Sequence, residues 1–560
     1  MEHKIYARYP LGNKRRAWKQ DNFILSNFSA RASDMRKCIR NCKDAGFNTV
    51  EIGWATHEQA DEAVIYCEQE GLDLIFQDLS RYGGMQRYRR CEQDGLTEVI
   101  REKRKYKRLI GYYIWDEPWK QDQLDAARVL TDECEREAPD LLPFTVAIPG
   151  YNPDDIWETD TFAAYLERYV TTIDPPILSL DYYPVGLPGY TLEKQLDDSK
   201  MWLDLGCMKV LGEKYGLPLW FYYQGVDLHK AGYFTFPMIR SMMYAATLYG
   251  CKALQHFSAV GSIIDQDGNK EWSFEDQKVI HEEFRNLGGT LMALTSKRVI
   301  HDESVDPGIA AYADMHQTEA DSAYLAGKLP HRASIAEFED GYGNGYIMIL
   351  NRDYETAQTF DLPLNGNYRL YEVSKTDGCQ YVVADSTDHI RVTLAKGDAV
   401  LYRIQKAEAF AKGEIDVPSG TAPESCYGKL YEMGGYVLLV GVSHAKNTYL
   451  HAVDEMLGVP NRITAETREV KIKRASGEVV TRHIHGHHCS FTNDISARFP
   501  QFETAFRYHG AITDGFLGDA PVQACDARIM KQTMETIFAR ADKDPLSDEA
   551  ALQPVWFVRK

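Results

Sequence analysis

Two adjacent carboxylates, Asp116 and Glu117, end an apolar and aromatic run that reads GYYIWDEPW from Gly111 onward. A buried run seldom ends in two acids, so we expect the pair to have a chemical role. Acid catalysis at a poor leaving group needs a carboxyl group of raised pKa, which a like charge and apolar surroundings both favour. Asp116 supplies the charge, and Trp115 and Trp119 supply apolar walls. The alternative is an ordinary acidic helix start, in which the carboxylates favour the dipole of the next helix.

Similar runs elsewhere in the first half also end in polar or aromatic residues. Asp181 is the clearest case, because it lies inside ILSLDYYP, where contact with water at a strand end would not explain it. It is our candidate for a second catalytic carboxylate. Aromatic rings can stack on the apolar faces of sugars, and amides, carboxylates and imidazoles can bond their hydroxyls. The substrate-binding candidates are Trp54, Trp115, Tyr183, Tyr223, Gln224, Asp227 and His256.

The elements that must position these residues form a repeating pattern. Residues 20–260 contain eight β-branched or aromatic runs, and most are separated by stretches with the 3.6-residue apolar spacing of helices. Two of these stretches, SDMRKCIRNCKDAG and HEQADEAVIYCEQEG, end in the glycine that is common after a helix. The runs are 23–30, 47–54, 72–78, 109–118, 143–151, 176–184, 218–225 and 251–261.

Strand–helix alternation repeated eight times predicts an α/β fold, a (β/α)8 TIM barrel over residues 1–300. An open doubly wound sheet is the rival, but no glycine-rich phosphate turn follows the first run. In a TIM barrel the chemistry lies at the carboxyl ends of the strands, which is where the candidate residues occur.

The rest of the chain changes character. Residues 301–405 show short alternating runs with Asn-Gly, Gly-Asn and Lys-Gly-Asp turns, and they predict an antiparallel β-sandwich. Residues 406–419 read as a linker. Residues 420–560 mix strand patterns such as GGYVLLVGV and REVKIKRA with loops, and they predict a third, α/β module.

Composition narrows the class of partner. The net charge of −19 disfavours binding of nucleic acid and of anionic lipid. No apolar run approaches the roughly 20 residues that span a bilayer, and the N-terminal segment lacks the apolar core of a signal peptide. We therefore expect a cytoplasmic protein whose 11 cysteines are buried thiols. The chain has 34 tyrosines and 9 tryptophans, whose rings can stack on sugars, so carbohydrate is the favoured partner. The composition leaves open whether the protein forms a homo-oligomer.

Asp116-Glu117-Pro118 resembles a motif of the retaining glycoside hydrolases that share a (β/α)8 barrel, a clan that includes β-galactosidases and cellulases. Those enzymes carry Asn-Glu-Pro at the end of the fourth strand, and a β-sandwich commonly follows their barrel. The resemblance covers residues 1–405 in architecture. It implies that Glu117 is the general acid/base of a glycosidase that needs no cofactor.

The chain departs from that clan at the seventh run, where the nucleophile would be a Glu and the sequence has Gln224. Four explanations stay open. In the first, Gln224 is an engineered amide replacement of the nucleophile. In the second, another strand supplies the second carboxylate, with Asp181 as the first choice and Asp227 as the second. Alternatively the substrate's N-acetyl group attacks, as in hexosaminidase families that carry an Asp-Glu or Asp-Asp pair, and Asp116 steers it. In the last reading the protein is catalytically inactive and only binds carbohydrate.

A second resemblance covers residues 420–558. SCYGKLYEMGGYVLLVGVSHAKNTYLHAVDE, which starts at Ser425, is similar to the aminoglycoside 3-N-acetyltransferase family, with its Asn-Thr-x-x-His before an acid. His451 matches the family's histidine, and Asp454 falls where the family usually has Glu. Only the family's C-terminal half is matched. The resemblance implies acetyl-CoA as a partner only if this module is active, in an aminosugar or aminoglycoside N-acetyltransferase.

A histidine cluster, HIHGHHC, lies within this module. Alternation along a strand would place His483, His485 and His487 on one face, where imidazoles can bind zinc or copper. A partly exposed strand followed by a polar loop is the plainer interpretation, because the cluster lacks a carboxylate or a second cysteine. We therefore predict no metal site.

Overall fold

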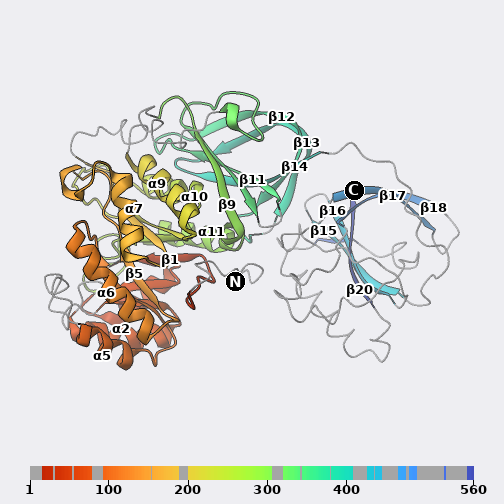
Figure 1. Ribbon diagram of the computed structural model, residues 1–560. Coiled ribbons are helices and arrows are strands. Elements are labelled where there is room, and N and C mark those ends of the chain that lie inside the picture. The colour runs from red at the N-terminus through yellow and green to blue at the C-terminus, as the bar shows by residue number, and fades with distance from the viewer. Residues whose placement is uncertain are drawn as a thin grey trace.

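The computed structural model describes residues 16–28, 32–52, 56–77, 93–152, 154–187, 200–305, 319–340, 343–378 and 380–407, and six strands further along the chain. Figure 1 shows the helices around the N-terminal strands and the antiparallel strands that follow them. None of the helices in these ranges is both long enough and apolar enough to cross a membrane. Each of the six cysteines with a described side chain is a buried free thiol, as the sequence predicts.

All eight predicted runs contain a strand. The strands are β1 (Ile24–Asn27), β2 (Thr49–Ile52), β3 (Asp73–Phe76), β4 (Leu109–Asp116), β5 (Leu142–Val146), β6 (Leu178–Tyr182), β7 (Leu219–Gln224) and β8 (Ala253–Phe257). They form two parallel sheets, β2-β3-β4-β5 and β1-β8-β7-β6.

The two parallel sheets meet at both of their edges. Before β2, the Asn48 N–H donates to Leu25 O of β1 at 3.1 Å. After β5, the Ala147 N–H donates to Ser179 O of β6 at 2.9 Å. Each strand therefore has its neighbour in sequence beside it, and β8 pairs with β1. The prediction of an α/β fold with parallel strands is confirmed.

Helices separate successive strands. They are α1 (Met35–Asp44), α2 (His57–Glu70), α5 (Gln93–Lys103), α6 (Gln121–Glu137), α7 (Phe162–Ile173), α9 (Lys200–Tyr215), α10 (Phe236–Leu248) and α11 (Phe274–Ala293). Helix α2 shows why they form where they do. Thr56 and Gln59 make a reciprocal capping box at its start, and Gly71, with φ of 74°, ends it.

Side chains of the parallel strands alternate between two cores. On β7, Trp220 and Tyr222 belong to an inner core enclosed by the two sheets. Phe221 and Tyr223 belong to a helix-side core that includes the apolar faces of the helices. The inner core comprises Trp18, Ile24, Phe28, Ile75, Tyr113, Leu142, Phe144, Val146, Ile177, Tyr183, Trp220, Tyr222 and Ala253. Because both faces of these strands are buried, apolar residues occupy nearly every position along them.

A six-stranded antiparallel sheet follows α11, in the order β13-β12-β14-β11-β10-β9. Its strands are β9 (Leu294–His301), β10 (Ala333–Asp340), β11 (Gly345–Asn351), β12 (Gln358–Val373), β13 (Gln380–Leu394) and β14 (Ala399–Lys406). The antiparallel prediction for this region is confirmed. The described residues form one hydrogen-bonded sheet there, so the sandwich packing stays a prediction.

The central strand β11 of this sheet is buried on both faces. On β11, Ile347 and Ile349 pack into the sheet's own core. Their neighbours Tyr346, Met348 and Leu350 pack into the helix-side core. The sheet therefore shares a continuous apolar core with the helices of the first region, and its position is fixed by burial.

The C-terminal region contains β15 (Cys426–Met433), β16 (Tyr436–Ser443), β17 (Ala465–Lys473), β18 (Val479–His487), β19 (Val522–Ala524) and β20 (Ala551–Arg559). They form a sheet in the order β17-β18-β20-β16-β15-β19. The strand patterns GGYVLLVGV and REVKIKRA correspond to β16 and β17. Almost all of the predicted linker, 406–419, lies outside the described residues.

Candidate active site

Three carboxylates, Asp116, Glu117 and Asp181, form a carboxylate cluster where β4 and β6 end. The side chains of Glu117 and Asp181 lie close enough for each to shift the pKa of the other. Asp116 accepts a hydrogen bond from the phenol of Tyr113 at 2.9 Å. The structure thus brings together all three residues that the sequence suggested as catalytic, from strands that are not adjacent.

A β-bulge in β4 aims Asp116 inward. Tyr113 pairs with Phe144 of β5, and the next paired residues are Trp115 and Thr145, so β4 holds one extra residue. Residues three apart in a regular strand face opposite sides. The extra residue puts Asp116 back on the side of Tyr113, which is why the two side chains can meet. Bulges of this kind are common beside active sites, where they redirect a side chain.

Glu117 follows in a strained conformation. Its φ is 50°, in the left-handed region that residues other than glycine seldom occupy. Its N–H donates to Val146 O at 3.1 Å, which extends the pairing with β5 by one residue. Such strain persists only where the surrounding structure holds it, and it concentrates at functional sites.

Asp181 reaches the same place by regular alternation. Leu180 and Tyr182, on either side of it, belong to the helix-side core. Asp181 and Tyr183 therefore face inward, and Asp181 is only 6% exposed. The carboxylate within the apolar run ILSLDYYP is explained by this inward position.

The electrostatics of the cluster favour retention of a proton. Burial, reinforced by the charge of Asp116, raises the pKa of Glu117 to about 7. Burial and the charges of Glu117 and Asp116 hold the pKa of Asp181 well above its ordinary value. Burial also raises the pKa of Asp116, although the Tyr113 hydroxyl opposes this. Two close, buried carboxyl groups resist carrying two negative charges, so the pair favours retention of one proton.

Three tyrosines surround the cluster. Tyr113 donates to Asp116, and Tyr183 lies close enough to Asp181 to lower its pKa. Tyr183 also packs on Phe257, with ring centroids 4.8 Å apart. Tyr151, in the loop after β5, has a pKa raised by burial and by the charges of Asp181 and Glu117. Sequence reasoning did not select Tyr113 or Tyr151, although Tyr151 ends one of the eight predicted runs.

A further buried acid, Glu51 of β2, lies outside the carboxylate cluster and was not selected as a site residue from the sequence. One carboxylate oxygen accepts from Ser26 Oγ at 2.5 Å and from Gln255 Nε2 at 2.7 Å. The other accepts from the phenol of Tyr222. Burial, with a contribution from the charge of Asp116, raises the pKa of Glu51 to about 8. The charge of Asp116 therefore acts on both Glu51 and Glu117.

Gln224 has a structural role, and its contact with a substrate stays a prediction. It is fully buried, and its Oε1 accepts from the Val185 N–H at 2.8 Å. Its Nε2 donates to Val185 O and Val226 O, each at 3.1 Å. The amide thus ties the segment after β6 to the segment after β7. Both amide protons have carbonyl acceptors, so an amide suits this site better than a carboxylate would.

Tyr223, His256 and Trp115 face the helix side of their strands, and their contact with a substrate stays a prediction. The Tyr223 hydroxyl meets His281 Nε2 at 3.3 Å, and its ring lies edge-to-face with His256 at 5.3 Å. Burial lowers the pKa of His256 to about 3, so this imidazole is neutral. Trp115 is buried in the helix-side core. None of the three faces the carboxylate cluster.

Asp227 lies in the loop after β7 and braces it. Its carboxylate accepts from the N–H groups of Ala231 at 2.7 Å and Gly232 at 2.8 Å. It does not shift the pKa of Glu117 in the way that Asp181 does, so Asp181 is the better second carboxylate. Trp54 lies outside the described residues.

The C-terminal candidates are placed only in part. His451 and Asp454 lie outside the described residues. His483, His485 and His487 lie on β18, where their backbones pair with Glu469, Thr467 and Ala465 of β17. In the part of the chain that the structure describes, no group of three or more His, Cys, Asp or Glu side chains could hold a metal ion.

Comparison with known proteins gives one family match and several weak structural likenesses. Residues 405–539 match the model of the aminoglycoside 3-N-acetyltransferase family. No curated protein matches the sequence.

Among solved structures, a catalytic mutant of a GH42 β-galactosidase from G. stearothermophilus has 8% identity and a TM-score of 0.46, covering 71% of this chain and 100% of that one. A β-galactosidase from Rahnella sp. R3 has 9% identity and a TM-score of 0.43, covering 70% and 99%. A β-glucuronidase from Ruminococcus gnavus has 9% identity and a TM-score of 0.33, covering 49% and 52%. Likenesses this weak do not indicate an activity. Both resemblances inferred from the sequence recur: the chain is similar to glycoside hydrolases and, over residues 405–539, to the aminoglycoside 3-N-acetyltransferase family.

Proposed function

We propose that the chain is a glycoside hydrolase whose eight parallel strands close into a (β/α)8 barrel, with the carboxylate cluster as its active site. The observation that carries the proposal is the close approach of Glu117 and Asp181 at the ends of β4 and β6, where burial raises both pKa values. The proposed domains are the barrel at 1–300, a β-sandwich at 301–405 and a module at 420–560, joined by a linker at 406–419.

In this proposal Glu117 is the general acid. While the two groups touch, their contact lowers the pKa of Glu117 and raises that of Asp181, so the proposal requires that a bound sugar separates them and leaves the proton on Glu117. Glu117 then gives this proton to the glycosidic oxygen as the C–O bond breaks. The carboxylate of Asp181 then faces the positive charge that develops at the anomeric carbon. It either forms a bond to that carbon or takes a proton from an attacking water.

The contact between Glu117 and Asp181 must open for this reaction. Retaining glycosidases hold their carboxyl groups about 5 Å apart, and inverting enzymes hold them roughly 6.5–9.5 Å apart. Glu117 and Asp181 are in direct contact, which is closer than either separation, so the bound sugar would separate the two groups. If the substrate carries an N-acetyl group, that group attacks instead and Asp116 orients it.

The test is hydrolysis of a panel of chromogenic aryl glycosides that includes N-acetylhexosaminides. We expect Glu117→Gln and Asp181→Asn to lose at least about 100-fold in kcat/KM, as is typical for removal of an acid–base group. Glu275→Gln, which changes a carboxylate that is 75% exposed and outside the cluster, is the control. Full activity of a folded Glu117→Gln variant would exclude Glu117 as the acid. Sugar binding without turnover in the wild type would indicate an inactive carbohydrate-binding protein.

A second candidate function is favoured by the family match over residues 405–539. It is transfer of an acetyl group from acetyl-CoA to the amine of an aminosugar or aminoglycoside, with His451 and Asp454 assigned by resemblance. Release of free CoA thiol in the presence of an aminoglycoside measures it. This candidate predicts that His451→Ala loses the activity and that Glu117→Gln keeps it. Absence of thiol release from the wild type would reject it.

A further inference from the structure

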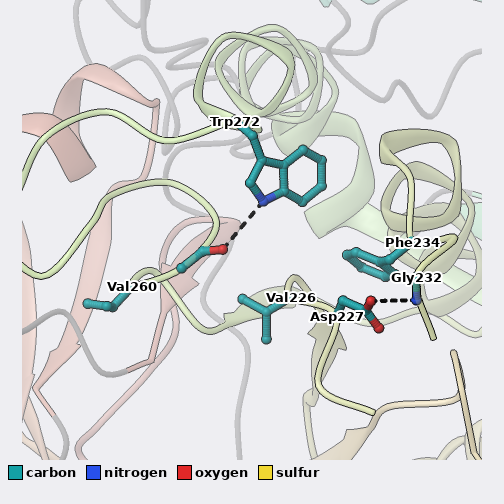
Figure 2. Close-up of a pocket in the computed structure, with 7 residues that line it drawn as sticks. Val226, Asp227, Gly232, Phe234, Val260 and Trp272 are labelled. Atoms are coloured by element: carbon teal, nitrogen blue, oxygen red, sulfur yellow. Dashed lines mark hydrogen bonds between the residues drawn. The ribbon is translucent and has the colours of Figure 1, made fainter. Parts of the chain in front are cut away.

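A pocket lies where the segments after β7 and β8 meet, apart from the carboxylate cluster. Its volume is about 460 Å³, and Figure 2 shows Trp272 across from Val226 and Asp227, with Phe234 beside them. The residues that line the pocket include Val226, Asp227, Gly232, Phe234, Val260 and Trp272. Because β7 and β8 are parallel to β4 and β6, this pocket opens at the same strand ends as the carboxylate cluster.

Trp272 is held in place yet remains exposed. Its indole N–H donates to Gly261 O at 3.4 Å, and Phe234 meets it edge-on with ring centroids 6.2 Å apart. Half of its surface, 50%, is exposed, whereas five other tryptophans of the chain are buried. A fixed aromatic face over a concave pocket is typical of a surface that binds a ligand.

The lining indicates an uncharged ligand with both apolar and hydroxylated surfaces. Val226, Val260 and the two rings offer apolar contact, and no Lys or Arg lines the pocket to neutralise a phosphate or carboxylate. Asp227 uses its carboxylate to hold the N–H groups of Ala231 and Gly232. A carboxylate offers about four acceptor positions, so Asp227 can still accept hydroxyl protons.

We propose that this pocket is an accessory sugar subsite, in which a pyranose ring stacks on Trp272 and donates hydroxyl hydrogen bonds to Asp227. The inference deepens the proposed glycosidase function. It rests on that function for the claim that the bound ligand is a saccharide. The substrate class that follows is an oligosaccharide rather than a simple glycoside, with one unit at the carboxylate cluster and another over Trp272.

A physical connection joins the two places. His229 Nε2 lies 3.1 Å from Tyr183 O, so the loop that carries Asp227 and Gly232 rests on the segment that follows Asp181. Tyr183 in turn packs on Phe257 at the end of β8. The subsite and the cluster are thus built on the same short loops at the ends of β6, β7 and β8.

The test measures binding directly, so it does not depend on turnover. Tryptophan fluorescence and saturation-transfer NMR would follow titration of the full-length Glu117→Gln variant with lactose, cellotriose, maltotriose and N,N′-diacetylchitobiose. Trp272→Ala added to Glu117→Gln removes the platform, and Trp272→Phe keeps an aromatic face. Val279→Ala, which truncates a residue 59% exposed on α11, is the matched control. Gly232→Asn adds a side chain at a pocket-lining position with open space around it and a φ of 76°, which Asn tolerates.

We expect at least one saccharide to bind, with affinity at least about tenfold weaker in Trp272→Ala and Gly232→Asn, and near wild type in Trp272→Phe and Val279→Ala. Unchanged affinity in a folded Trp272→Ala variant would overturn the proposal, as would absence of binding by every saccharide in the panel. Tighter binding of tetramethylammonium than of any saccharide would also overturn it, because the pocket would then be a cation site. Trp272-dependent binding without hydrolysis by the wild type would reject the glycosidase function and leave the subsite standing.

Discussion

At the scale of single residues, the chemistry of the site depends on how three acids share charge. Glu117 and Asp181 hold a proton between them because both are buried and both feel the charge of Asp116. Asp116 keeps its place through Tyr113, whose phenol donates to it and lowers its pKa relative to burial alone. The roles are therefore distinct: Glu117 and Asp181 carry the proton, and Asp116 sets how tightly it is held.

The substitution Asp116→Asn tests this division of roles. The amide keeps an acceptor for the Tyr113 hydroxyl but removes the negative charge that raises the pKa of Glu117. A lower pKa means that Glu117 loses its proton at lower pH. We expect both limbs of the pH profile of kcat/KM to move to lower pH, because the charge of Asp116 raises the pKa of Asp181 as well as that of Glu117. An alkaline limb that stays in place or moves upward would show that the charge of Asp116 does not act on the acid.

At the scale of elements, the strands could be predicted and their inward-facing residues could not. All eight runs contain strands, because β-branched and aromatic composition marks them. Both faces of these strands are buried, however, so hydrophobicity does not alternate along them. Sequence reasoning chose Tyr223 and His256, whereas Tyr222 and Gln255, one position earlier, face inward and bind Glu51.

The same limit explains why the placement of Asp116 could not be read from its spacing. Counting by twos from Tyr113 puts Asp116 on the helix side, and only the bulge at Ile114 returns it to the inner side. The placement of Asp181 was easier to predict, because a charged residue within an apolar run can be accommodated in few environments of the folded protein. The contact between Glu117 and Asp181 joins β4 and β6, and such long-range proximity has no local signal.

Gln224 gives a prediction at this scale, because it fastens two elements together. In Gln224→Glu both donor hydrogen bonds are lost, and a carboxylate faces Val185 O and Val226 O. We expect this change to lower the free energy of unfolding by roughly 2–4 kcal/mol, measured by urea denaturation, without a gain in hydrolysis. Gln266→Glu, at an exposed position, is the control. New hydrolytic activity at unchanged stability would revive the interpretation of Gln224 as a replaced nucleophile.

At the scale of the whole molecule, the apolar core is continuous from the parallel strands to the antiparallel sheet, and buried acids lie within it. Ala399 and Leu401 of β14 belong to the same helix-side core as Leu178 of β6 and Phe284 of α11. A charge placed inside this core should therefore affect the stability of both regions together. Glu51 lies on the inner side of the same strands, bound by Tyr222 and Gln255, and it is the most informative buried acid because it is 0% exposed and has no cationic partner among its hydrogen-bonding neighbours.

The pKa of Glu51 rises from 4.5 to about 8 on folding, so the folded chain binds this proton more tightly than the unfolded chain does. Its contribution to stability is present below about pH 4.5 and is lost as pH rises through about 8. Glu51→Gln, which is always neutral, should lack this loss. We expect the melting temperature of Glu51→Gln to gain on that of the wild type as pH rises from about 5 to about 8, measured by calorimetry.

Glu275→Gln, at a side chain that is 75% exposed, serves as the control and should show a constant difference. A constant difference for Glu51→Gln as well would mean that Glu51 is ionised in the folded chain throughout this range. Its three donors would then stabilise the carboxylate more than burial penalises it. In that case Glu51 would carry a negative charge near Asp116 throughout this pH range. That charge would contribute to the raised pKa values of the carboxylate cluster.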